Sequence, residues 1–347
     1  MGREFGIRRS PYLHDHKPDL VIITRTPFRI SFVGGGSDLP SFYRQHGGAV
    51  LSTTIDKYMY ISSHDYFEPG EIRTKYSKTE TVGAVADLQH PILRTIMQKL
   101  GVGEGLEVSS IADVPAGTGM GSSSSFTVGT LHNLMARQGR LAEVDKAWLG
   151  HTACQVELED LGEPIGKQDQ YAAAYGGLNI IRFLPNDTVE VQALDLSQHL
   201  QGEFCQHLKL YYLGNQRSAS AILAEQSQKS SEADKVAALK TMVSFVDPFA
   251  TDLLAGHWAG LGAHLHENWK LKQSLASGIS NPRIQEAYEA GLGAGAWGGK
   301  LLGAGGGGFM LFVAPPSAHS ALDAAMNDCR PFPFQLDSEG SKVIFNG

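Results

Sequence analysis

The chain has few cysteines, no excess of basic residues and no long apolar run, and each shortage excludes a class of protein. Its three cysteines, Cys154, Cys205 and Cys329, lie far apart without a CxxC pair, which argues against a disulfide framework or a structural zinc site. The 29 Lys and Arg residues are outnumbered by 36 Asp and Glu residues, which disfavours a protein that binds nucleic-acid backbones. No stretch approaches the roughly 20 apolar residues of a membrane span, and the charged N-terminus lacks a signal-peptide core. We therefore expect a cytoplasmic protein with no nucleic-acid or membrane partner.

Glycine is the residue present in excess, at 40 of 347 positions, where about 7% would be usual. The glycines follow no G-X-Y period and prolines number only 15, which excludes collagen-like and low-complexity classes. They gather instead in four clusters, at 34–36, 117–121, 293–298 and 303–308. At about 150 residues per domain, the length predicts two domains or one large one.

Two of these clusters match the sequence pattern of a dinucleotide-binding loop, but the predicted elements around them do not fit such a loop. GAGAWG (293–298) and GAGGGG (303–308) both read G-x-G-x-x-G. The dinucleotide fingerprint needs a strand before it and a helix after it. Here the first match follows a predicted helix and the second precedes a predicted strand, so a tight turn is the simpler interpretation of each. A P-loop is excluded because Leu301 follows Lys300, and no GxSxG nucleophile elbow occurs.

Hydrophobic patterning predicts an α+β protein in which strands dominate the first half and helices the second. Expected strands are 20–24, 28–33, 49–55, 58–64, 106–111, 176–183, 189–194, 207–213, 308–314, 332–336 and 342–346. Expected helices are 123–137, 141–161, several between 218 and 293, 283–293 and 317–328. A division between two lobes is expected near 195–206.

The segment PAGTGMGSSSS (115–125) is the most informative one, because it follows a predicted strand and opens a predicted helix. Glycines let the backbone approach a bulky anion, and a helix N-terminus with serine hydroxyls supplies donors and partial positive charge. The segment therefore predicts a phosphate cradle without a Walker lysine. A flexible Gly/Ser linker is the alternative, which the flanking strand and phased helix disfavour.

Several charged residues near the glycine clusters allow both a chemical and a structural interpretation. Asp169 lies in a turn rich in small and aromatic residues, where a carboxylate can accept a substrate proton or coordinate a cation. Glu157 alone is more simply part of a solvated helix face, and Asp38 could cap a helix. Arg25 and Arg29 are by default surface charges that share one face of a strand.

Taken together, three motifs resemble the GHMP kinase superfamily, which includes galactokinases and homoserine, mevalonate and phosphomevalonate kinases. The motifs are RTPFR…GGGSD (25–38), PxGxGMGSS (115–123) and KLLGAGGGG (300–308), and they occur in the family's order. The resemblance spans about 24–314. It implies a two-lobed GHMP kinase fold, with an N-terminal domain like domain 2 of ribosomal protein S5 and an α/β C-terminal domain. The domains implied are 20–200, with the ATP loop and catalytic Asp, and 201–347.

The resemblance also assigns roles to residues. It implies that Asp169 is the catalytic carboxylate and that Arg29 favours its charged form or stabilises charge during transfer. It implies Mg²⁺ ligation by Ser123 and Glu157, with ATP as co-substrate. ATP-binding residues implied are Pro115, Gly117, Gly119, Met120, Gly121, Ser122, Ser123 and Ser124. Substrate-binding residues implied are Gly35, Gly36, Ser37, Asp38, Arg217, Gly305 and Gly306.

Within the superfamily, the first motif departs from the Gly-Glu-His-Thr-Asp-Tyr of galactokinases. The runs at 32–61, 166–177 and 215–223 are instead similar to D-glycero-α-D-manno-heptose 7-phosphate kinases, which phosphorylate the anomeric hydroxyl. Kinases for L-fucose or another hexose share parts of the pattern and remain an alternative, as does a silent sugar or nucleotide sensor. Lys57, Lys75, Lys167 and Arg217 are candidates for a cation that meets a substrate phosphate. The expected partners are a sugar or sugar phosphate and ATP, and a homodimer is possible.

Overall fold

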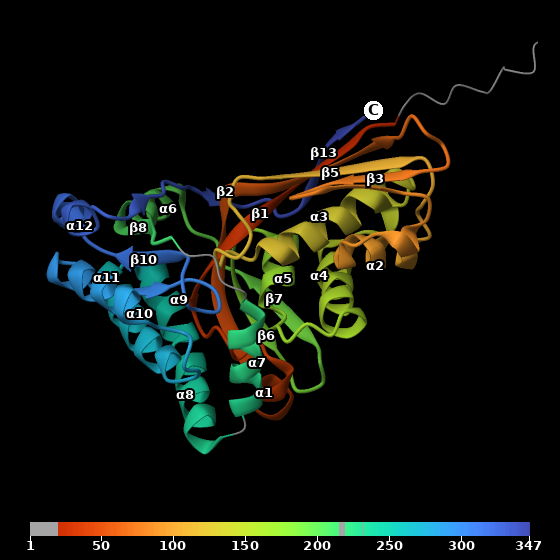
Figure 1. The fold of residues 1–347 in the computed structure, drawn as a ribbon. Helices are drawn as coiled ribbons and strands as arrows, with labels where there is room; N and C mark the ends of the chain where they lie inside the picture. Colours follow the sequence, from red (N-terminus) through yellow and green to blue (C-terminus); the bar gives the residue numbers. More distant parts are fainter. Residues whose placement is uncertain (1–19, 215–218, 231) are drawn as a thin grey trace, which may run out of the picture.

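The protein is described by a computed structural model, in which residues 20–214, 219–230 and 232–347 are placed (Figure 1). Two sheets with flanking helices make up this part of the chain, as the α+β prediction expects. The nine-stranded first sheet is formed by β1 (Ile22–Val33), β2 (Gly48–Asp65), β3 (Ile72–Lys75), β4 (Thr79–Val82), β5 (Leu106–Ala112), β6 (Leu178–Phe183), β7 (Val189–Ala193), β12 (Leu336–Asp337) and β13 (Lys342–Asn346). The four-stranded second sheet is formed by β8 (Leu208–Tyr212), β9 (Gly298–Leu301), β10 (Phe309–Val313) and β11 (Arg330–Pro331).

Helices flank both sheets (Figure 1), and among the described residues six α-helices come before β8 and six after it. Those up to residue 207 are α1 (Pro40–His46), α2 (Pro91–Leu100), α3 (Ser122–Arg137), α4 (Lys146–Cys154), α5 (Gln168–Tyr175) and α6 (Gln198–His207), with 3₁₀ turns η1 (Val85–Asp87) and η2 (Leu141–Glu143) and the π-helix η3 (Gln155–Asp160). Those that follow are α7 (Ala219–Lys229), α8 (Ala233–Ser244), α9 (Val246–Ala255), α10 (Trp258–Gln273), α11 (Pro282–Gly293) and α12 (His319–Ala325), with the 3₁₀ turn η4 (Pro316–Ala318). None of the helices in the described ranges combines the length and apolarity needed to cross a bilayer.

Two long strands organise the first sheet. The predicted strands 20–24 and 28–33 are one strand, β1, whose register against β2 shifts after Pro27. The predicted strands 49–55 and 58–64 are likewise one strand, β2. Its first part pairs with β6 and its second part with β5, so a single strand links two portions of the sheet. The sequence splits both strands because proline and polar residues interrupt the apolar pattern, whereas the sheet tolerates them at a register shift.

The helix predicted over 123–137 is confirmed as α3, which begins at Ser122. Most of its side chains are buried against β1, β2 and α5, including Phe126, Leu131 and Leu134. A rigid helix in the core therefore carries the glycine–serine segment at its N-terminus.

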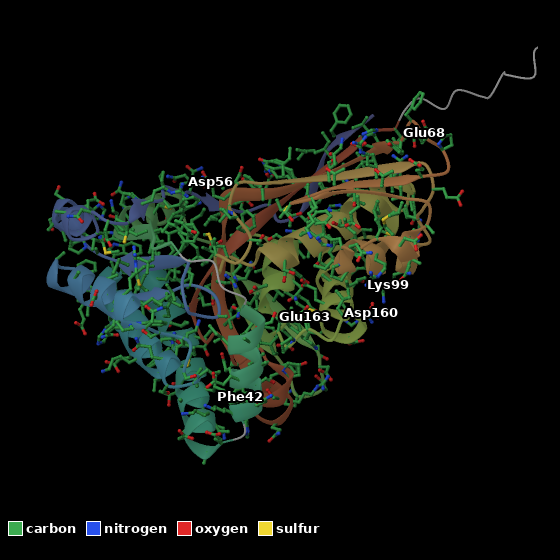
Figure 2. The ribbon with its side chains drawn as sticks, viewed as in Figure 1. Phe42, Asp56, Glu68, Lys99, Asp160 and Glu163 are labelled. Carbon is green, nitrogen blue, oxygen red and sulfur yellow. The ribbon has the colours of Figure 1, made fainter. Side chains whose placement is uncertain are left out.

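The helix predicted over 141–161 is wrong in its details. A 3₁₀ turn, α4 and η3 occupy this range, and η3 has the wider π-helical turn that is frequent at functional sites. Asp160, at the end of η3, lies 2.9 Å from the Nζ of Lys99 on α2, and Figure 2 labels both residues. This ion pair ties the segment that carries Glu157 to the neighbouring helix.

The last strands return to the first sheet. β13 pairs with β1 and β12 with β2, so these two short strands from the proposed second domain complete the sheet of the first. The strand predicted over 332–336 is mostly wrong, since only Leu336 of that range lies in a strand, and the helix predicted over 317–328 ends at Ala325. The strand β9 was not predicted, because its two glycines conceal the β pattern. The division into domains 20–200 and 201–347 stays a prediction.

Candidate active site

A cavity of about 280 Å³ lies where the helices of the two halves meet, and it collects most of the predicted site residues. Its lining comes from β1, the loop before α1, the N-termini of α3 and α5, and from α7, α10 and the loop after β9. Glu163 and Ser220, 3.3 Å apart, join the loop before α5 to the start of α7 at its edge, and Figure 2 shows Glu163 beside α7. Residues from distant parts of the sequence thus enclose one space.

The phosphate loop, defined here as residues 115–121, forms one wall of this cavity. Gly117, Gly119 and Gly121 have φ values of +76°, +86° and +77°, a backbone region that favours glycine. Gly121 is the N-cap of α3, so the free N–H groups of the helix face the same space as the loop. Such a backbone arrangement suits an anion, which is the role that the sequence predicts for this segment.

Behind this loop, Glu157 is held by three hydrogen bonds. Its carboxylate accepts bonds from the Oγ of Ser123 at 2.5 Å, the Oγ of Ser124 at 2.8 Å and the Nε2 of Gln170 at 2.6 Å. Burial raises the pKa of Glu157 despite these bonds, and the charge of Asp169 adds to the increase. The solvated helix face that was the alternative for Glu157 is therefore wrong, since only 1% of this residue is exposed.

The serine and the carboxylate fit a hydrated Mg²⁺ ion. Ser123 is exposed and lines the cavity, whereas Glu157 lies directly behind it. Mg²⁺ prefers oxygen ligands and usually keeps several waters while it binds one or two protein groups and substrate phosphates. Ser123 and Glu157 supply such oxygens next to the phosphate loop.

Asp169 and Arg29 form a two-point ion pair at the centre of the cavity wall. The Nε and Nη2 atoms of Arg29 each donate to one carboxylate oxygen of Asp169 at 2.7 Å, and Nη1 donates to the carbonyl of Gly119 at 2.6 Å. Arg29 is buried in β1, while Asp169, in the first turn of α5, keeps 24% of its side chain exposed. A Cβ on Gly121 would lie 3.3 Å from both side chains. The carboxylate is thus fixed in direction and open on the side of the phosphate loop.

Asp38 is the last residue of the loop 34–38, is buried and also lines the cavity. Its Oδ1 accepts bonds from the N–H of Gly36 at 2.9 Å and the Nε2 of Gln168 at 3.2 Å. A Cβ on Gly166 would lie 1.8 Å from its Oδ2, so this position requires glycine. Burial and the charge of Asp169 raise the pKa of Asp38. Asp38 does not cap α1, whose N-cap is Leu39, so that structural alternative is wrong.

Three further polar side chains of the cavity lining carry buried atoms without a partner in the described part of the chain, and these atoms lie next to Gly35 and Gly36 of the loop that carries Asp38. The Oγ of Ser31, the Oε1 of Gln168 and the Nε2 of Gln226 are buried, lack a hydrogen-bond partner among the described residues and belong to residues that line the cavity. Buried polar atoms are normally paired, so unpaired ones around a cavity indicate a polar ligand.

Two buried lysines complete the lining. The Nζ of Lys300 donates to the carbonyls of Ser31 at 2.7 Å and Phe32 at 2.9 Å, so this side chain holds β9 against β1. The Nζ of Lys272, on α10, donates to the carbonyl of Gly303.

Most of the predicted residues line the cavity, and a minority do not. Those that do are Arg29, Gly35, Gly36, Asp38, Gly117, Gly119, Gly121, Ser122, Ser123, Ser124 and Asp169. Pro115, Met120, Ser37, Glu157, Gly305 and Gly306 lie outside the lining. Arg217 lies outside the described residues.

The residues outside the lining support the walls. Ser37 exchanges hydrogen bonds with the backbone of Ala49 at 3.1 Å, and Met120 is fully buried, its carbonyl accepting from the N–H of Arg29. Gly305 and Gly306 pack on Ile279, while Gly303 of the same motif touches the phosphate loop. The prediction that Ser37, Gly305 and Gly306 face the substrate is therefore not reproduced by the cavity.

Sequence reasoning missed Ser31, Gln168, Gln226 and Lys272. One signal was available, because Leu261, Leu265, Trp269 and Lys272 recur at helical spacing on a single face of α10. A lysine on the apolar face of a helix is unusual. The other three residues lie in segments whose proximity only the fold reveals.

Two family models match the chain. The model described as GHMP kinases N terminal domain matches residues 87–177, and the model described as GHMP kinases C terminal matches residues 249–329. The first match contains the phosphate loop and Asp169, and the second contains Lys272 and the third glycine motif.

Among curated proteins, the chain is similar to the D-glycero-alpha-D-manno-heptose 7-phosphate kinase of Campylobacter jejuni, with 27% identity over 340 residues that cover 92% of this chain and 98% of the relative. It is also similar to the bifunctional fucokinase/GDP-fucose pyrophosphorylase of Arabidopsis thaliana, with 26% identity over 87% of this chain. In that case it spans 31% of the longer relative.

Solved structures share the fold. A D-glycero-D-manno-heptose 1-phosphate kinase from Bacteroides thetaiotaomicron superposes with a TM-score of 0.76 at 24% identity, covering 93% of this chain and 99% of the other. The Lactococcus lactis galactokinase complexed with galactose gives a TM-score of 0.73 at 15% identity, covering 93% and 95%.

Proposed function

Because the chain belongs to the GHMP kinase family, we propose that it transfers the γ-phosphoryl group of ATP to the anomeric hydroxyl of D-glycero-α-D-manno-heptose 7-phosphate, giving the 1,7-bisphosphate. The family and its relatives make the chain a sugar kinase, which is a phosphotransferase, and the phosphate already present on the acceptor is part of the proposal. The identity of the sugar and the position of transfer are the proposed part.

One observation carries this proposal. The Asp169–Arg29 pair lies between the phosphate loop and the buried polar atoms of Ser31, Gln168 and Gln226. A phosphate cradle on one side and unsatisfied hydrogen-bonding groups on the other suit a nucleotide and a polyhydroxylated acceptor. The carboxylate between them can receive the proton of a hydroxyl.

The mechanism follows from these positions. The phosphate loop and the N-terminus of α3 bind the triphosphate, and Asp38, Gln168 and Gln226 orient the sugar. Asp169 accepts the proton of the anomeric hydroxyl as its oxygen forms a bond to the γ-phosphorus. The bond from that phosphorus to the β–γ bridging oxygen breaks, and ADP leaves. Arg29 keeps Asp169 directed at the hydroxyl and contributes positive charge beside the phosphoryl group.

GHMP kinases use ATP, typically with Mg²⁺, and Ser123 and Glu157 are the residues that would hold the ion here. When bound, Mg²⁺ neutralises negative charge on the triphosphate. The chain's own contribution is positional, because phosphoryl transfer depends on alignment and charge stabilisation more than on covalent catalysis.

A hexose 1-kinase, such as an L-fucokinase, is the second candidate. The Arabidopsis relative and an L-fucokinase/L-fucose-1-P guanylyltransferase of Bacteroides fragilis support it, at 26% identity each. The two candidates differ in whether the acceptor already carries a phosphate.

An ADP-release assay over a panel of acceptors tests the proposal. The panel should contain D-glycero-α-D-manno-heptose 7-phosphate, the unphosphorylated heptose, L-fucose, D-galactose and D-mannose. We expect the highest kcat/KM with the heptose 7-phosphate, and a product whose anomeric proton shows a new coupling to phosphorus in NMR. Preference for an unphosphorylated hexose would support the second candidate, and no turnover with any acceptor would support a sugar or nucleotide sensor.

A further inference from the structure

Lys272 is a buried cation without an acidic partner in the active-site cavity. It lies in the last turn of α10, is 5% exposed and lines the cavity together with Asp169 and Ser122. Among the described residues no carboxylate lies within 4.0 Å of its ammonium group, whose one recorded partner is the carbonyl of Gly303. An ammonium group has three donors, so two remain for a ligand.

Lys272 lies close to the phosphate loop, because its partner Gly303 contacts that loop. A Cβ on Gly303 would lie 2.3 Å from the Cα of Gly119, so the two backbones touch. Arg29 donates to the carbonyl of Gly119 from β1, while Lys272 donates to Gly303 from α10. Two cations from opposite halves of the chain therefore flank the middle of the phosphate loop.

Lys300, which lines the same cavity, differs from Lys272 because it has a structural role. Its ammonium group is satisfied by two backbone carbonyls that join β1 and β9. Lys272 has no second carbonyl of this kind among the described residues. A buried charge that lacks its counterion is costly unless a ligand supplies one.

The electrostatic surroundings agree with this geometry. Burial, followed by repulsion from Arg29, lowers the pKa of Lys272 to about 8, while Asp38 and Asp169 oppose the decrease. An anion placed between Arg29 and Lys272 would relieve the repulsion and favour the charged lysine.

We propose that Lys272 is a catalytic residue that donates hydrogen bonds to the oxygens of the phosphoryl group during its transfer from ATP to the acceptor. This inference rests on the proposed function. Lys272 forms no covalent bond and loses no proton in the step. It stabilises negative charge, together with Arg29, as the bond to the acceptor oxygen forms and the bond to ADP breaks.

The test compares K272M and K272Q with K270M. Lys270 is an exposed residue on the same helix, 3.3 Å from Glu267, and provides the matched control. Met removes the charge at similar length, and Gln keeps a donor for the Gly303 carbonyl, so the second variant carries the test if the first does not fold. We expect kcat to fall about 100-fold or more in both variants, as for the loss of one donor to a transition-state oxygen. The Kd of ATP should change less than threefold, and K270M should match the wild type.

A kcat within twofold of the wild type in a folded variant would overturn the proposal. A change confined to the KM of a phosphorylated sugar would also overturn it, because Lys272 would then bind the phosphate that the acceptor already carries.

Binding of ADP with aluminium fluoride, a mimic of the group in transfer, gives a readout independent of turnover. We expect K272M and K272Q to weaken this binding at least tenfold and to leave the binding of ADP alone unchanged. If the wild type turned over no sugar, the proposed function would fail, while this comparison would still decide the role of Lys272. Equal affinities would then overturn that role.

Discussion

The two walls of the cavity are built in different ways. The phosphate wall is a continuous stretch of sequence, Gly117–Ser124, held at the N-terminus of a buried helix. The acceptor wall is assembled from four separate segments that contribute Ser31, Asp38, Gln168 and Gln226. The first wall has its own hydrogen bonds in place, such as those to Glu157, whereas the second contains several unpaired polar atoms.

This difference suits the two walls to different substrates. A local, pre-organised loop suits ATP, the reactant that all kinases of this kind share. An acceptor wall drawn from both halves of the chain can change at single positions without disturbing the loop. Substitutions on the two walls should therefore have separable effects on nucleotide binding and on sugar binding.

The largest effect is expected at Asp169, where the two walls meet. D169N removes the proton acceptor while it keeps the size of the side chain, so kcat should fall at least 10³-fold. The Kd of ATP, measured by titration calorimetry, should change less than threefold. D328N, a change at an exposed carboxylate that lies 3.4 Å from Arg283 and away from the cavity, is the control. A D169N enzyme that keeps a tenth of the wild-type kcat would contradict the assignment.

A smaller effect is expected on the phosphate wall. S123A and E157Q should each raise the Mg²⁺ concentration for half-maximal activity by about tenfold or more, because they remove oxygens that suit the ion. The KM of the sugar should stay within twofold. E159Q, which changes an exposed carboxylate of the same π-helix, is the matched control. Unchanged Mg²⁺ titrations for both variants would show that this wall does not hold the metal.

On the acceptor wall we expect substitutions to change the KM of the sugar and to leave the KM of ATP unchanged. Q226L removes a buried amide whose Nε2 lacks a partner among the described residues, and it should raise the KM of the sugar about tenfold. The KM of ATP should stay within twofold, and Q228L, at an exposed position of α7, should change neither. Equal increases in both KM values would mean that the two walls are not independent.

The same division explains how much the sequence could predict. The glycine turns and the helix start at residues 117–122 were predicted at the correct residues, because glycine spacing, serine donors and the following helix lie in one window. Resemblance to the family added Asp169, Arg29 and Asp38, which the fold brings together. Ser31 and Gln226 were out of reach, because nothing local distinguishes a serine or glutamine in a cavity from one at the surface.

The fold shows the same limit. Helix α3 was predicted closely because its apolar positions are regular over 16 residues. The π-helix η3 was not predicted, since apolar spacing over six residues does not distinguish a π-helical turn from an α-helical one. The return of β13 to β1 is a pairing between the two ends of the chain, and alternation within a five-residue strand cannot specify its partner.

The smallest effect is expected at His132 on α3, the helix that carries the phosphate wall. It concerns the pH dependence of the free energy of unfolding, and measuring it distinguishes unfolding in acid from loss of activity in acid. His132 lies on α3, with its Nδ1 3.1 Å from the Oγ of Ser341, and burial lowers its pKa to about 4 from an unfolded value of 6.5. The folded state holds this imidazole neutral, so its contribution is complete above pH 6.5 and is lost as the pH falls toward 4. Between pH 7 and pH 5 the loss should be about 2 kcal/mol.

Urea unfolding of the wild type and H132N at the two pH values measures this contribution. Asn offers a polar atom near the position of Nδ1 but does not titrate. Between pH 7 and pH 5 the free energy of unfolding of H132N should therefore decrease by about 2 kcal/mol less than that of the wild type. Identical slopes would contradict the buried neutral histidine. H132N lacks this contribution to acid unfolding. A loss of turnover in H132N between pH 7 and pH 5 can therefore be attributed to groups in the walls of the cavity. A rise in sugar KM alone would then point to protonation of Asp38, whose pKa burial already raises.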